Sequence, residues 1–164
     1  MWASPPRRLA GGTAVLGMLV GIGLWWGYFD FVSHHLPRPG NLMVSGWMYL
    51  HLPMTAGMAA VGAASLNVVE HAGDALPPEV SWLLLGAVAI VLVSVALLMR
   101  TIQVSGSREL VHRTASHVPL GSSAIVLLLG FTGLSAVSLL ALLLVVMLAP
   151  VFYGFKIWLQ TLGA

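Results

Sequence analysis

The chain has 164 residues, of which 59% are hydrophobic and only 7% are charged, and its mean hydropathy is +0.96. An ordinary soluble domain carries about a quarter charged residues, whereas here the apolar residues form runs near bilayer-spanning length. The composition therefore excludes a water-soluble fold and indicates an integral membrane protein. The net charge of +2 comes from scattered basic residues without a basic patch, so we expect no nucleic-acid partner. Cysteine is absent, which excludes disulfides, thiolate metal sites and cysteine nucleophiles.

The apolar runs predict an all-α fold, a polytopic transmembrane helical bundle in which residues 1–164 form a single transmembrane domain. Five spans are expected, at residues 9–31, 42–69, 80–99, 118–132 and 135–159. The first follows Arg7 and Arg8, as a secretory signal would, but it lacks a small-residue cleavage pattern and is predicted to be retained. At its far end, Trp25, Trp26 and Tyr28 are expected in the headgroup layer, where amphipathic aromatic rings are enriched.

The second span is long for a single crossing. Its 28 positions reach about 42 Å in a helix, which exceeds the ~30 Å of a hydrocarbon core, so the helix must tilt, kink or emerge. Pro53 lies inside this span and offers the kink, because proline removes a backbone donor and obstructs a carbonyl. Neighbouring helices or polar side chains are expected to compensate at this position.

The third span, residues 80–99, is directly preceded by Pro77 and Pro78, which a first turn tolerates, and by Glu79, which suits the positive end of the helix dipole. A basic loop is expected after it, over residues 100–117. This loop separates the third span from the last apolar stretch of the chain.

That stretch, residues 118–159, has 42 positions with Lys156 as its one charge, which is enough for two crossings. The break is predicted in GFTGLS, residues 130–135, because its glycines permit a tight turn and Ser135 can cap the next helix. If residues 118–149 form one tilted helix instead, the chain has four spans.

The distribution of lysine and arginine predicts the orientation in the membrane. With five spans, one face holds Arg7 and Arg8 together with the acidic connection at residues 70–79. The opposite face holds the other basic residues, which are Arg38, Arg100, Arg108, Arg113 and Lys156. Two against five favours the second face as cytoplasmic, so the amino terminus is expected outside.

The segment YLHLPMTAG, residues 49–57, places polar side chains inside an apolar span. His51 falls about nine residues, or ~13 Å, into the span, and an ionisable residue at such a depth is a functional candidate that can change charge near neutral pH. The candidate polar intramembrane site comprises Asp30, Tyr49, His51 and Thr55. The alternative is that these groups compensate Pro53 and fix how helices dock, which is worth about 0.6 to 2 kcal/mol per contact. In either case the imidazole must find its partner on an adjacent helix.

Two GxxxG pairs, Gly17 with Gly21 and Gly23 with Gly27, lie on the first span. Close helix packing explains them, and a ligand groove is the alternative. The adjacent His34 and His35 point apart on any regular element and make a poor metal pair, so we predict no metal site and no cofactor. Paired carboxylates and nucleophile motifs are also missing, so we predict that the protein is not an enzyme.

Two motifs, WWGYFDFV at residues 25–32 and YLHLPMTAGMAAVGAA at residues 49–64, together with their spacing, resemble the bacterial low temperature requirement A (LtrA) family of polytopic membrane proteins. The resemblance extends more loosely to Arg100. Carried over residue by residue, the motif positions are Trp25, Trp26, Tyr28, Phe29, Asp30, Tyr49, His51, Leu52, Pro53 and Gly57, and Met54 stands where a leucine is common. The resemblance implies a chain that corresponds only to the carboxy-terminal part of a family member.

The family is named for a growth phenotype in the cold, and the resemblance implies no defined molecular activity. Two classes of function stay open: solute or proton transport along a polar path around the second span, and a structural or lipid-adaptive membrane component, including one part of a split larger membrane protein. The expected location is the bacterial inner (plasma) membrane, with several passes. The expected partners are the lipid bilayer and further transmembrane helices, from another chain or from a homo-oligomer.

Overall fold

The computed structural model describes residues 7–33, 35–72, 74–104 and 114–162. The elements in chain order are α1 (Arg7–Tyr28), the π-helical segment η1 (Phe29–Ser33), α2 (Asn41–Glu70), α3 (Pro78–Thr101), α5 (His117–Leu129) and α6 (Ala136–Leu162). The described part of the chain contains no strand beyond isolated bridges, so the predicted all-α fold is confirmed. Arg108, Arg113 and His34, which the sequence analysis singled out, lie outside the described residues.

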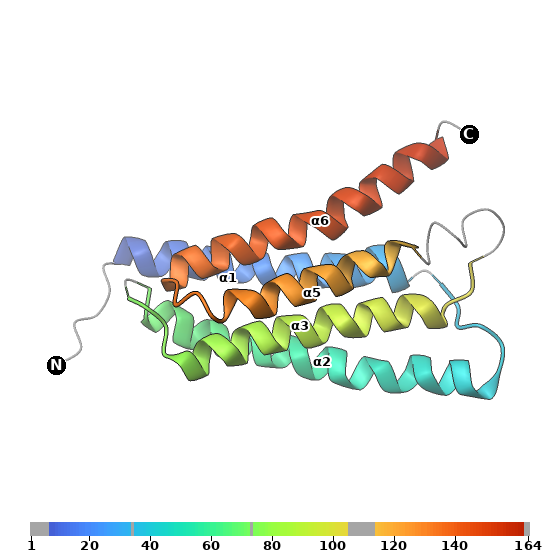
Figure 1. Cartoon of the computed structure of the whole chain (residues 1–164), viewed down its shortest axis with the longest axis horizontal. Helices are drawn as coiled ribbons and strands as arrows, with labels where there is room; N and C mark the ends of the chain where they lie inside the picture. Colours follow the sequence, from blue (N-terminus) through green and yellow to red (C-terminus); the bar gives the residue numbers. More distant parts are fainter. Residues whose placement is uncertain (1–6, 34, 73, 105–113, 163–164) are drawn as a thin grey trace.

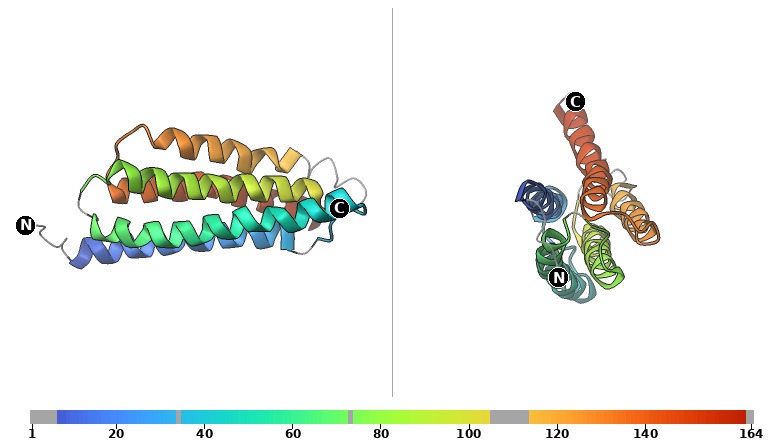
Figure 2. Two further views of the ribbon diagram at one scale, coloured as in Figure 1. Left: turned by 90° about the horizontal axis from the view of Figure 1, so that it is seen from below. Right: turned by 90° about the vertical axis from the view of Figure 1, so that its left-hand side faces the viewer.

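The helices run up and down along one long axis, and successive helices point in opposite directions (Figure 1). Viewed along that axis, α3 lies between α2 and α5, while α6 lies between α1 and α5 (Figure 2). α3 is the most buried of the long helices. α6 carries Pro150 and leans away from the bundle toward its carboxyl end (Figure 1).

Four helices within the described ranges are long and apolar enough to cross a membrane: α1 continued through η1, α2, α3 and α6. α5 has 13 residues and reaches about 20 Å, which is less than the ~30 Å of a hydrocarbon core. The chain breaks between α5 and α6, so residues 118–149 do not form the single tilted helix on which the four-span alternative was based. The number of candidate spans is four because α5 is too short to cross the hydrocarbon core.

The predicted break at residues 130–135 follows from local chemistry. Gly133 adopts φ 61°, a left-handed conformation that glycine reaches without the steric cost of a Cβ. Ser135 then precedes α6, and its Oγ accepts a bond from the Ser138 backbone N–H at 3.4 Å, as an N-cap does. The turn and the cap together end α5 and start α6.

Gly133→Ala is expected to lower the free energy of unfolding by about 1 to 2 kcal/mol, because an L side chain in the left-handed region is strained. The measurement is denaturation of the purified protein in mixed micelles, followed by tryptophan fluorescence. The control is Gly86→Ala in α3, where nothing lies within 4 Å of the added Cβ and helix propensity favours alanine. Equal stability of the two variants would contradict the role of the turn.

At each end of the bundle, segments that connect different helices are joined by backbone hydrogen bonds. At one end, the Arg38 backbone N–H donates to Thr101 O at 2.8 Å, and its Nε donates to Ile102 O at 3.0 Å. This places a cation at the negative carboxyl end of α3, which the helix dipole favours. At the other end, the Ala136 N–H donates to Asp74 O at 3.3 Å. Arg38 and Arg100 therefore lie at one end of the bundle and Arg7 and Asp74 at the other, as the alternation of spans predicts.

Candidate functional site

The ring of His51 is held from within its own helix. His51 is half-buried on α2, and its Nδ1 lies 2.6 Å from the backbone oxygen of Trp47, one turn earlier. A carbonyl oxygen only accepts, so Nδ1 carries the proton and donates it. In the neutral imidazole this leaves Nε2 as an acceptor that points away from the backbone of α2.

The acceptor Nε2 meets Tyr28 of α1. The Tyr28 hydroxyl lies 3.1 Å from Nε2 and donates to it. The two rings are edge to face, with centroids 5.7 Å apart, and the Trp47 ring packs against the imidazole at 4.5 Å. The imidazole thus has its polar partner on an adjacent helix. We call these two residues the Tyr28–His51 pair.

The local structure of the chain fixes the position of Tyr28. Tyr28 is the last residue of α1, and the backbone widens directly after it into the π-helical η1. Within η1, Phe31 and Val32 are buried, and Ser33 Oγ donates to Phe29 O at 2.9 Å. These contacts anchor the end of the helix, so the tyrosine ring enters the bundle at a fixed level. π-Helical turns of this kind are frequent at functional sites.

The other residues of the predicted polar site lie on the outer surface. Asp30 is exposed in η1, and the Tyr49 side chain is 70% exposed on α2. Thr55 is exposed as well, and its hydroxyl donates to the backbone oxygens of His51 at 2.8 Å and Leu52 at 3.0 Å. Pro53 lies inside α2 on its exposed side. The contact that the structure describes for the imidazole is therefore with Tyr28, which the predicted polar site did not include.

The family-motif positions divide into a buried and an exposed group. Gly57 is buried where α2 crosses α3, and a Cβ added there would lie 2.7 Å from Val91 Cγ2 and 3.1 Å from Ala87 O. Only glycine lets the two backbones approach this closely. The exposed group comprises Asp30, Tyr49 and Pro53, described above, and the apolar or aromatic Trp25, Trp26, Phe29 and Leu52. Exposed apolar and aromatic side chains are what a bilayer-facing surface requires.

Sequence reasoning missed two contributors to the site, the pairing of Tyr28 with His51 and the role of Trp47. Tyr28 was assigned to an aromatic belt together with its tryptophan neighbours. The i, i+4 spacing of Trp47 and His51 is a signal that could have been used, because it stacks both side chains on one helix face. Among the described residues, no three histidine or acidic side chains cluster as metal ligands would.

The fold and the pair define a class: a polytopic helical membrane protein with an ionisable residue bound across two of its helices. The comparison with protein families then identifies the family within this class. The chain belongs to the bacterial low temperature requirement A protein (LtrA) family, whose model matches residues 9–153. No curated protein and no solved structure matches the chain. The expectation that the chain corresponds only to the carboxy-terminal part of a family member is not borne out, since the family model matches most of the chain.

Proposed function

We propose that the chain transfers protons, alone or coupled to a solute, across the bacterial inner (plasma) membrane by way of the Tyr28–His51 pair. The observation that carries the proposal is the 3.1 Å hydrogen bond between the Tyr28 hydroxyl and His51 Nε2, inside helices of membrane-spanning length. Ionisable groups at such positions are rare because they are costly, and those that occur commonly mark proton and substrate pathways.

The geometry allows a proton to be handed on. A proton that reaches Nε2 turns this atom from an acceptor into a donor toward the Tyr28 oxygen, while Nδ1 keeps its bond to Trp47 O. The hydroxyl proton of Tyr28 is then free to turn to another acceptor. When that proton leaves to the other acceptor, the proton on Nε2 moves to the Tyr28 oxygen. This step restores the hydroxyl and the neutral imidazole with a bare Nε2, so the pair can work repeatedly.

Two neighbouring backbone and side-chain groups support a polar path. Pro53 has no N–H, so the Tyr49 carbonyl, four residues earlier, lacks its normal helical donor. Trp47 Nε1 is buried and, within the described part of the chain, has no hydrogen-bond partner. The Tyr49 carbonyl, without its normal helical donor, and the Trp47 N–H, unpartnered among the described residues, lie within two turns of His51 and suit a water or a polar solute. Interrupted helices are common at transporter sites.

A second candidate function is a structural or lipid-adaptive membrane component. It is favoured by the outward position of Tyr49 and by the bonds of the Thr55 hydroxyl to its own helix, because neither side chain extends the path beyond the pair. In this class the Tyr28–His51 bond only docks α1 on α2, with a worth of about 0.6 to 2 kcal/mol.

The protonation state of His51 separates the two functions. In bilayers, ¹⁵N spectra of histidine-labelled protein, compared with His51→Gln to assign the signal, are expected to show Nδ1 protonated and Nε2 bare at high pH. When a proton gradient is imposed across the bilayer, transfer through the pair is expected to place a proton on Nε2 as well. A His51 signal that stays neutral throughout would contradict proton transfer and leave the docking role.

A further inference from the structure

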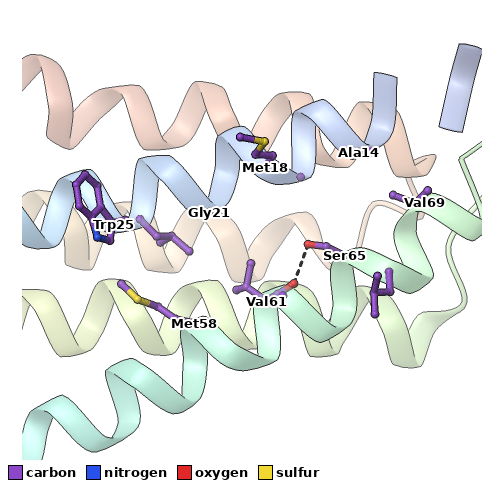
Figure 3. A pocket seen from close by; sticks show the side chains of 12 residues that line it. Ala14, Met18, Gly21, Trp25, Met58, Val61, Ser65 and Val69 are labelled. Carbon is purple, nitrogen blue, oxygen red and sulfur yellow. Dashed lines mark hydrogen bonds between the residues drawn. The ribbon is translucent and has the colours of Figure 1, made fainter. Parts of the chain in front are cut away.

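A groove of about 510 Å³ runs between α1 and α2 on the outer side of the bundle. Figure 3 shows Trp25 and Met58 at one end of it and Ala14 and Val69 at the other. His51 and Tyr28 do not line it, so the groove is separate from the pair discussed above.

The glycines of α1 make the hollow. A Cβ added at Gly17 would lie 3.5 Å from Ser65 Oγ, and one added at Gly23 would lie 3.7 Å from Met147 Sδ, so these two glycines serve close packing. Nothing lies within 4 Å of a Cβ added at Gly21, or at Gly62 on the facing helix. The sequence left two roles open for the GxxxG pairs, close helix packing and a ligand groove. In the first pair, Gly17 has the packing role and Gly21 leaves the space of the groove.

The groove has the length of one bilayer leaflet. From Ala14 to Trp25, eleven residue steps rise about 16 Å, and half of a hydrocarbon core is ~15 Å. Its inner end, at Met58, follows Gly57, which packs against Ala87 and Val91 at the middle of α3. Trp25 lies at this middle level, nearer the centre of the bundle than the headgroup position expected from its sequence. The groove thus runs from mid-bundle to the end where α2 finishes.

Charges of opposite sign follow at that end. Arg7 lies seven residues before Ala14, on the same face of α1 and about 10 Å further along the axis. Glu70 lies four residues after Leu66, which lines the groove on α2, so it continues the same row. Both Arg7 and Glu70 are exposed. A cation on one wall and an anion on the other complement a zwitterion.

From this arrangement we infer that the groove holds one acyl chain of a zwitterionic glycerophospholipid. The phosphate lies against Arg7 and the headgroup amine against Glu70. An acyl chain fits the walls because they are apolar and because the surrounding medium supplies it. The glycines on both walls leave room for an acyl chain to be ordered against the protein.

The test is photocrosslinking in vesicles. Wild-type protein is reconstituted with phosphatidylethanolamine that carries a diazirine on its acyl chain, irradiated, and digested for mass spectrometry. Label is expected to concentrate in residues 14–25 and 58–69. Gly21→Leu and Gly62→Leu fill open space and are expected to reduce this label about tenfold, since burial of the chain drives its binding. Gly121→Leu, at an equally open helical glycine of α5 that does not line the groove, is the control and is expected to change nothing.

Competition identifies the headgroup. Unlabelled phosphatidylethanolamine is expected to displace the label from wild type several-fold better than phosphatidylglycerol, and Arg7→Gln and Glu70→Gln are each expected to remove that preference. Label that persists unchanged in both leucine variants would overturn the proposal, because it would show only the general lipid annulus. Equal competition by the two lipids in wild type would also overturn it. Crosslinks between two copies of the chain through α1 and α2 would show instead that a second copy covers the groove.

Discussion

Gly57→Ala is expected to destabilise the protein by about 1 to 3 kcal/mol, the usual cost of overpacking a tight contact. The added Cβ would lie 2.7 Å from Val91 Cγ2 and 3.1 Å from Ala87 O. Valine χ1 is restricted in a helix and the carbonyl belongs to the backbone of α3, so α2 and α3 must move apart. The measurement is the free energy of unfolding in mixed micelles, with tryptophan fluorescence as the signal.

The same crossing provides its own control and rescue. Gly62→Ala, five residues later on α2, meets nothing within 4 Å and is expected to be neutral or stabilising by up to about 1 kcal/mol. Val91→Ala is expected to recover part of the loss when combined with Gly57→Ala, with a coupling energy of about 0.5 to 3 kcal/mol. Strictly additive effects of the two substitutions would show that Gly57 is not required for the close approach.

His51→Gln is expected to reduce proton flux into proteoliposomes by about a hundredfold or more, the range that a positioned acid–base group contributes. Glutamine can still accept a hydrogen bond from the Tyr28 hydroxyl, so α1 and α2 stay docked. Its amide, however, does not take up a proton at neutral pH. Flux is measured with a trapped pH-sensitive dye under an imposed membrane potential. Tyr28→Phe keeps the ring and removes the hydroxyl, and it is expected to reduce flux in the same way.

His71→Gln is the matched control for this prediction. His71 lies at the end of the same helix and makes the same type of bond, from Nδ1 to the backbone oxygen four residues earlier, at 2.8 Å to Asn67. It is expected to leave flux unchanged. Wild-type flux no higher than that of empty vesicles would refute proton transfer. Variants of the pair that lose abundance and thermal stability, while flux per folded molecule is retained, would support docking instead.

The helices and the break between α5 and α6 could be predicted from the sequence because their causes are local. Runs of apolar residues favour helices of membrane-spanning length, since the bilayer leaves no water for the backbone. Gly133 and Ser135 satisfy a turn and a cap within a few residues of each other. The family, too, could be recognised from two short motifs, although the extent of the match could not.

The tertiary structure alone decided which polar groups meet. Hydropathy indicates how deep His51 lies in the span, but not in which direction its side chain points from the α2 axis. The sequence therefore suggested Asp30, Tyr49 and Thr55 as its neighbours, whereas in the structure the imidazole bonds to Tyr28. The groove depends in the same way on where two helix axes cross: Gly17 packs and Gly21 stands open, although both belong to one motif. Contacts between helices are set by the angle and distance of packing, which many distant residues determine together.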